Sequence, residues 1–265
     1  MFFHEYPIAE IFDMVDESGL DSIEFWFETP AFWLAGMPAD DLRSCIADHP
    51  GLTHLTSHTP ILDLNVTSIN PKVAKISTEY ALSTLELAEA SGLAVHTVHP
   101  GRRTAKRPPS AADYERFEYY IDLLREASRG KKVKIAMENM EVKVNSLLCT
   151  PEDARELLDR EPWLNFTLDV SHAMGKSVGE VHRYIELCYD RLVNVHLARA
   201  DGEKMHLPMN RRPEMAEILR ALDESGYAGN LTLEIEDRNF PQDLCSEEKV
   251  LILMQELEFM KECVG

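Results

Sequence analysis

The sequence predicts a single-domain (β/α)8 barrel, an α/β fold in which eight parallel strands alternate with helices over residues 1–265. Three observations lead to this prediction. Strand-like and helix-like segments alternate along the whole chain, which is typical of a parallel sheet. The 265 residues and 45% apolar content suit one barrel, since such barrels often have roughly 250 residues. Five predicted strands also end on a side chain that can bind a metal, which indicates a shared rim.

The strands are expected, in chain order, near residues 2–5, 21–27, 52–58, 93–99, 132–138, 164–169, 191–197 and 230–236. Between them the apolar residues recur at helical spacing, as at Phe117, Ile121 and Leu124. Thr150-Pro151 supplies a helix cap and a first-turn proline. No linker, low-complexity tract or second domain is visible, so we expect one domain.

Side-chain alternation gives five of these strands two different faces. Their metal-binding ends are His99, Glu138, Asp169, His196 and Glu234. The residue two positions before each end is small or polar, namely Thr97, Ala136, Thr167, Asn194 and Thr232. The residue one position before is apolar, namely Val98, Met137, Leu168, Val195 and Leu233. Because alternate residues of a strand point to opposite faces, we expect the apolar face under helices and the ligands at one rim of the interior.

The composition limits the classes of function. A formal net charge of −19 repels polyanions and gives no general footprint for nucleic acid. The chain has no apolar run long enough to span a membrane and no basic start followed by an apolar stretch, so we expect neither a membrane span nor secretion. Its five cysteines include no Cys-x-x-Cys pair, which favours reduced thiols and a cytoplasmic location. A homo-oligomer stays open.

Four of the strand ends form the best candidate for a metal site. Glu138, Asp169, His196 and Glu234 offer three carboxylates and one imidazole. This set suits Mn²⁺, Mg²⁺, Co²⁺ or Zn²⁺. Any one of these residues alone is more simply explained as a rim salt bridge or a hydrogen-bonded histidine, but the shared register of all four favours a metal. His96, on the opposite parity, is expected to be structural.

A longer series of polar residues in chain order resembles the superfamily of xylose-isomerase-like TIM barrels. The series is His58-Thr59-Pro60, His99-Pro100-Gly101, Glu138-Asn139, Asp169-Val170-Ser171-His172, His196 and Glu234. That superfamily includes sugar and sugar-phosphate isomerases and epimerases, and the endonuclease IV type of abasic-site nuclease. The resemblance covers roughly the second to the eighth predicted strand. It implies a barrel with a metal site and leaves the substrate open.

The nuclease branch of this superfamily implies three zinc ions held by nine ligands. The chain is similar at eight of the nine positions, which are His58, His99, Glu138, Asp169, His172, His196, His206 and Glu234. The ninth ligand is an aspartate two residues before the last histidine, and this chain has Lys204 there. A lysine ammonium repels a cation, so we expect the third metal position to be weakened. This departure and the acidic charge argue against a nuclease without closing that alternative.

The isomerase and epimerase branch needs one metal, and we expect one or two ions per chain. By this interpretation Glu138, Asp169, His196 and Glu234 bind the ion, and Glu138 and Glu234 also exchange a proton with the substrate through an enediolate. His172 contacts substrate oxygens, while His58, His99, His172 and His206 are candidates for a second or third metal. A third interpretation is an inactive barrel that binds a ligand, but a decayed site has no physical reason to keep four polar groups together.

Basic residues in two loops bear on the substrate. Arg102 and Arg103 follow His99-Pro100-Gly101, and Arg199 and Arg211 lie after His196. Arginine binds phosphate and carboxylate through paired hydrogen bonds. We therefore expect a small anionic sugar, such as a sugar phosphate, as the substrate. The alternative is that these are solvated loop charges.

Overall fold

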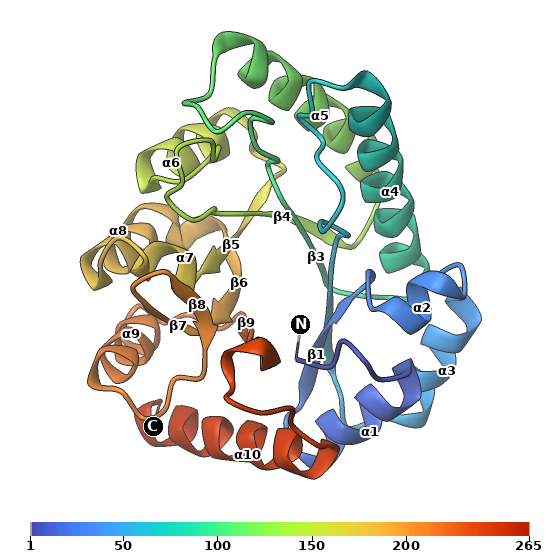
Figure 1. Ribbon diagram of the computed structural model, residues 1–265, viewed down its shortest axis with the longest axis vertical. Helices are drawn as coiled ribbons and strands as arrows, with labels where there is room; N and C mark the ends of the chain where they lie inside the picture. The colour runs from blue at the N-terminus through green and yellow to red at the C-terminus, as the bar shows by residue number, and fades with distance from the viewer. Residues whose placement is uncertain (1, 265) are drawn as a thin grey trace.

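The computed structural model describes residues 2–264 as an α/β barrel of parallel strands surrounded by helices (Figure 1). The two terminal positions of the predicted 1–265 domain lie outside the described residues. Within them the main sheet has seven strands in the order β1-β2-β3-β4-β5-β6-β9, all paired in parallel. These strands are Ser22–Trp26 (β1), His54–His58 (β2), Val95–Val98 (β3), Lys134–Glu138 (β4), Asn165–Asp169 (β5), Leu192–Leu197 (β6) and Asn230–Leu233 (β9).

The long helices form the outer layer of the barrel, and all of them except the first, which precedes β1, come after a strand in the chain (Figure 1). They are Ile8–Glu17 (α1), Ala39–Asp48 (α3), Pro71–Ala90 (α4), Ala111–Ser128 (α5), Pro151–Arg160 (α6), Val178–Cys188 (α8), Pro213–Glu224 (α9) and Ser246–Cys263 (α10). The Thr150 side chain caps α6, as its sequence predicts. None of the helices in residues 2–264 is long and apolar enough to cross a membrane.

Four shorter elements follow the ends of strands in the described residues. They are Pro30–Leu34 (α2), Val170–Met174 (α7), a 3-10 helix at Asp237–Asn239 (η2), and an antiparallel hairpin of Arg199–Asp201 (β7) and Lys204–Leu207 (β8). A second 3-10 helix, Tyr189–Arg191 (η1), directly precedes β6. The hairpin was not expected from the sequence, and it carries His206 to the rim.

The predicted strand at residues 2–5 is wrong, because this segment forms turns. In this segment Phe2 packs in a small apolar cluster with Ile235 and Leu253. The fully buried Lys249 of α10 donates hydrogen bonds to the Phe2 carbonyl and to Glu5 Oε1. The Lys249 side chain therefore satisfies the Phe2 carbonyl, which in a strand would accept a hydrogen bond from a neighbouring strand.

The predicted parity of the strands is confirmed. On the interior side, Thr97 Oγ1 lies 3.1 Å from Thr167 Oγ1, and Asn194 Nδ2 donates to Thr97 Oγ1 at 3.3 Å. Thr232 Oγ1 in turn donates to Asn194 Oδ1 at 3.0 Å. These hydrogen bonds form a polar layer across the barrel. On the other side the apolar positions join the main core, as seen for Val98, Met137, Leu168, Val195 and Leu233.

His96 is structural, as expected. It lies on the helix-facing side of β3 and is fully buried, with Nδ1 2.9 Å from Ser57 Oγ and Nε2 3.3 Å from Thr84 Oγ1. Burial lowers the pKa of His96 to about 3, so the ring is neutral.

Candidate metal centre

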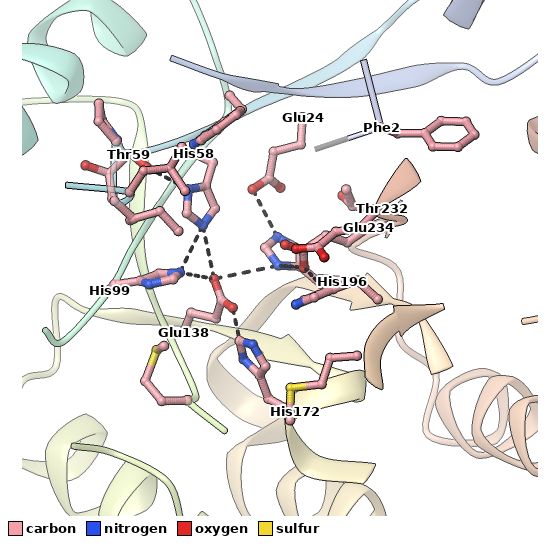
Figure 2. Close-up of a pocket in the computed structure, with 18 of the residues that line it drawn as sticks. Phe2, Glu24, His58, Thr59, His99, Glu138, His172, His196, Thr232 and Glu234 are labelled. Carbon is pink, nitrogen blue, oxygen red and sulfur yellow. Dashed lines mark hydrogen bonds and ion pairs between the residues drawn. The ribbon is translucent and has the colours of Figure 1, made fainter. Parts of the chain in front are cut away.

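A cavity of about 720 Å³ opens at the rim where the parallel strands end. Seven of the eight residues expected from the sequence as metal ligands line it, namely His58, His99, Glu138, His172, His196, His206 and Glu234. The eighth, Asp169, is buried beside them. Figure 2 shows six of the seven pointing toward one another. Three groups of ligand atoms form within residues 2–264.

The central group is the one expected from the four strand ends. Glu138, Asp169, His196 and Glu234 each place a ligand atom within 4.8 Å of the others. β4 and β5 end at the first two residues, β6 carries the third, and Glu234 directly follows β9. His196 Nδ1 lies 2.9 Å from Glu234 Oε2 and 3.7 Å from Glu138 Oε2.

A second group joins two histidines to the same glutamate. The Nε2 atoms of His58 and His99 lie 3.1 Å apart, and Glu138 Oε2 is 3.2 Å and 3.0 Å from them. His58 Nδ1 donates to the Thr59 carbonyl at 2.7 Å, which leaves its Nε2 to face Glu138. Glu138 is thus shared by two groups (Figure 2).

A third group consists of Asp169, His172 and His206. Asp169 Oδ2 lies 3.5 Å from His172 Nδ1 and 4.0 Å from His206 Nδ1. Asp169 Oδ1 also accepts a hydrogen bond from the His172 backbone, so the carboxylate caps α7 and fixes its histidine. His206 has φ 56°, a left-handed conformation that is uncommon outside glycine. Lys204 is exposed and does not line the cavity.

The central group fits a divalent ion because three of its ligand atoms are buried and have no hydrogen-bond partner. Asp169 Oδ2, His196 Nδ1 and Glu234 Oε2 are buried without a hydrogen-bond partner. A buried polar atom left unpaired costs about 1–3 kcal/mol. Two of these atoms are 2.9 Å apart without hydrogen-bond geometry. Two ligands that are each ~2.1 Å from one ion and at right angles to each other lie about 3 Å apart.

The charges of the site depend on one another. Burial raises the pKa of Asp169 to about 7, against the opposing charge of His172. Burial would also raise the pKa of Glu138, but the charges of His99 and His196 hold it well below its usual value. Burial disfavours the charged forms of His172 and His196, yet the surrounding carboxylates raise the pKa of His172 to about 9 and that of His196 well above normal. The histidines thus balance the carboxylates with positive charge, a role that a divalent ion can also fill.

Glu24 has a role that the sequence alone did not indicate. Its Oε1 lies 3.0 Å from His196 Nε2, and its Oε2 accepts hydrogen bonds from Asn194 and Thr56. Glu24 therefore holds the His196 ring so that Nδ1 faces the central group (Figure 2). Its place on β1, at the same level as the interior polar layer, was the available signal.

Glu141 was missed altogether. It lines the cavity in the loop after β4, and its Oε2 lies 3.8 Å from His172 Nε2.

The four arginines predicted to bind substrate do not all lie at the cavity. Arg102 lines the cavity, whereas Arg103, Arg199 and Arg211 do not. Arg103 donates to the Pro108 carbonyl, Arg199 Nη1 lies 3.3 Å from Asp201 Oδ2, and Arg211 pairs with Glu258 and Glu262 of α10. These three guanidinium groups are used in contacts within the protein.

Comparison with known proteins gives the same picture. The family model described as "Xylose isomerase-like TIM barrel" matches residues 12–263. A curated relative, "Uncharacterized protein MJ1188" of Methanocaldococcus jannaschii, is 30% identical over 270 residues, which span 100% of this chain and 97% of the relative.

Solved structures with a similar fold include sugar epimerases. A D-tagatose 3-epimerase-like protein superposes with a TM-score of 0.74 at 22% identity, covering 96% of this chain and 94% of that one. D-allulose 3-epimerase from Methylomonas sp. gives a TM-score of 0.77 at 15% identity, covering 99% and 94%. A protein from Thermus thermophilus, soaked with ZnCl2, gives 0.70 at 18% identity, covering 97% and 94%.

Proposed function

This chain belongs to the xylose isomerase-like TIM barrel family, and on that premise we propose that it is a metal-dependent isomerase or epimerase of keto sugars or sugar phosphates. The observation that carries the proposal is the central group, in which two glutamates, one aspartate and one histidine converge with three buried atoms unpaired. Such a group has a reason to persist when it binds an ion and a substrate together.

Four residues would hold the ion. Glu138, Asp169, His196 and Glu234 provide its ligands, and His58 and His99 add a second position through Glu138. Mn²⁺, Mg²⁺, Co²⁺ and Zn²⁺ all suit carboxylate and imidazole ligands, and we expect one or two ions per chain. When bound, the ion supplies Lewis-acid polarisation of the substrate carbonyl.

The two glutamates would move the proton. Their pKa values are held low by neighbouring histidines, so both are carboxylates that can accept a proton from the carbon beside the carbonyl. Glu138 ends β4 and Glu234 follows β9, two strands that are not neighbours in the sheet, so the two carboxylates reach the same group from different parts of the rim. One carboxylate can remove the proton and later release it to water, while the other, after taking up a proton from water, returns a proton to the opposite face of the carbon. His172, with its pKa raised to about 9, is positively charged and can donate a hydrogen bond to a substrate oxygen.

The test is proton exchange on candidate substrates. The metal-loaded protein would be incubated in D₂O with a panel of ketoses and ketose phosphates and followed by NMR. We expect one of them to gain deuterium at the carbon next to the carbonyl and to form its epimer or aldose. Glu234→Gln should retain the fold and lose this exchange. Exchange at the wild-type rate in that variant would remove Glu234 from the mechanism.

An abasic-site nuclease is the second candidate function, and the third group favours it. Asp169, His172 and His206 converge although Lys204 replaces the expected aspartate, and Lys204 lies outside the cavity. Against this stands the net charge of −19, which repels DNA. Cleavage of a duplex with one abasic site, dependent on three zinc ions per chain, would move this function ahead of the first.

An inactive ligand-binding barrel is the third candidate. The buried unpaired atoms argue against it, because replacing them with apolar side chains would relieve the cost of burying them. Protein that binds no divalent metal would favour it.

A further inference from the structure

Two of the basic side chains that line the cavity lack a protein partner. Four lysines and arginines line it, and two of these are paired, Lys143 with Glu141 and Arg238 with Glu236. The side chains of Arg102 and Lys106 make no hydrogen bond or ion pair within residues 2–264. The chain has 46 acidic and 27 basic residues. Acidic partners are therefore abundant, and yet these two cations in the lining of the cavity remain free.

The backbone that carries Arg102 is held firmly. Its N–H donates to Asn65 Oδ1 at 3.0 Å, and its carbonyl accepts from Asn65 Nδ2 at 2.8 Å and Thr67 Oγ1 at 2.9 Å. Arg102 also forms a β-bridge with Ser146. Gly101 before it has φ +78°, and a Cβ there would lie 2.6 Å from Thr67 Oγ1, so the tight turn requires glycine. Only the Arg102 side chain remains to be ordered by a ligand, which lowers the entropy cost of binding.

The next arginine in the same loop behaves differently. Arg103 donates to the Pro108 carbonyl, and its Nη1 lies 3.7 Å from Asp113 Oδ2. Its backbone is bound to Asn145 on both sides, with the N–H and the carbonyl each engaged at 2.9 Å. The loop thus directs Arg103 into the protein and Arg102 to the cavity, so the free guanidinium is specific to one position.

We propose that Arg102 and Lys106 form an anion subsite that binds the phosphate or carboxylate group of the sugar. A guanidinium offers paired donors to such a group, and an ammonium adds a second positive charge. The keto and hydroxyl oxygens of the same molecule would lie at the central group of Glu138, Asp169, His196 and Glu234, since Arg102, Lys106 and three of these four residues border one cavity. This inference rests on the proposed function, which it narrows to anionic sugars.

The test is equilibrium binding of three probes to the metal-loaded protein by calorimetry. The probes are D-ribulose, D-ribulose 5-phosphate and the keto acid D-tagaturonate, in wild type, Arg102→Ala and Arg102→Ala with Lys106→Ala. Arg107→Ala is the matched control, because Arg107 carries the same charge in the same loop and does not line the cavity. We expect one charged probe to bind at least about tenfold more tightly than ribulose, as one charge-assisted contact implies.

Arg102→Ala should remove most of this advantage, the double variant should remove the rest, and Arg107→Ala should keep it. Preference for ribulose 5-phosphate identifies a phosphate site, and preference for tagaturonate identifies a carboxylate site. Equal binding of ribulose and both anions, or an advantage that survives in the double variant, overturns the subsite. Loss of abasic-duplex cleavage in Arg102→Ala also overturns it, because the loop would then hold a DNA backbone.

The same experiment separates this inference from the proposed function. An anionic sugar that binds through Arg102 but exchanges no proton supports the subsite and contradicts the isomerase. Proton exchange on a ketose phosphate or keto acid that is unchanged in Arg102→Ala with Lys106→Ala supports the isomerase and contradicts the subsite.

Discussion

Two polar layers of the barrel interior lie two residues apart along the strands and differ in whether their side chains have hydrogen-bond partners. The lower layer, Thr97, Thr167, Asn194 and Thr232, is joined by hydrogen bonds between its own side chains. The upper layer, Glu138, Asp169, His196 and Glu234, is equally enclosed but leaves three buried atoms unpaired. Polar burial alone therefore does not identify a functional site. Polar burial without partners, among charged groups that face a cavity, is the basis on which we propose one.

The sharpest way to separate the layers is to change one residue in each on the same strand. Glu234→Gln removes the carboxylate charge and should reduce turnover by about 10³-fold, within the range for a general base. Thr232→Val, two residues earlier, removes one hydrogen bond and should retain turnover within about threefold, a loss of less than 1 kcal/mol. Steady-state kinetics on both variants gives the comparison. Similar losses in the two would show that the layers do not differ in function.

Metal removal should affect the upper layer alone. An ion present at ~100 times its dissociation constant stabilises the folded state by about 3 kcal/mol. Chelation should therefore lower the melting temperature of the wild type, whereas Glu138→Ala, which lacks the residue shared by two groups, should melt at the same temperature with or without chelator. A wild type that is insensitive to chelator would contradict the assignment of a resident metal.

Glu24 connects the two layers and offers a subtler change. It touches His196 above and Asn194 and Thr56 at its own level. Glu24→Gln should weaken metal affinity by about 10–100-fold, as the loss of a partner behind a metal-binding histidine does elsewhere. Glu28→Gln is the control, because Glu28 accepts hydrogen bonds from the backbone N–H groups of Ile61 and Leu62 and is not one of the partners of His196. Competition with a chelating dye measures both affinities, and equal values would remove Glu24 from the metal site.

The lower layer should matter for stability only. Thr97→Val breaks the contacts of Thr97 with Thr167 and Asn194, and should cost about 1–3 kcal/mol of unfolding free energy by leaving buried groups unpaired. Metal content should stay at the wild-type value. Urea unfolding and elemental analysis would check the two statements, and a loss of metal in this variant would make the lower layer part of the site.

The effect of His96 on stability appears only at low pH. Its folded pKa is lowered to about 3, while the unfolded chain takes up a proton near 6.5. Its stabilisation is therefore complete above pH 6.5 and is lost as the pH falls toward 3, by at most about 1.4 kcal/mol per pH unit. His96→Gln should lose less stability than the wild type between pH 6.5 and 4 in chemical unfolding. Parallel curves for the two proteins would show that His96 is not the titrating group.

The strand ends could be predicted from the sequence because a strand has a period of two. If Thr97, Thr167 and Asn194 point into the barrel, the candidate ligands two residues later on each strand must point inward at the rim. Contacts made by long side chains have no such period. Nothing local in the sequence separates Arg102, which is free, from Arg103, which is held by Pro108 and Asp113.

The segment at residues 2–5 has the same explanation. Its structure depends on Lys249, which lies far along the chain and is buried only because Glu5 and Asp237 meet it. The hairpin that carries His206 likewise depends on pairing between Arg199 and Leu207. Its sequence has no alternating apolar pattern from which the hairpin could be predicted.

The most direct test of the account is the amount of divalent metal in protein purified without chelator, measured by elemental mass spectrometry for the wild type, Thr97→Val and Glu138→Ala. We expect one or two ions per chain in the wild type and in Thr97→Val, and a marked loss in Glu138→Ala. Wild-type protein without metal, even after incubation with Mn²⁺ or Zn²⁺, would contradict it, as would full metal content in Glu138→Ala.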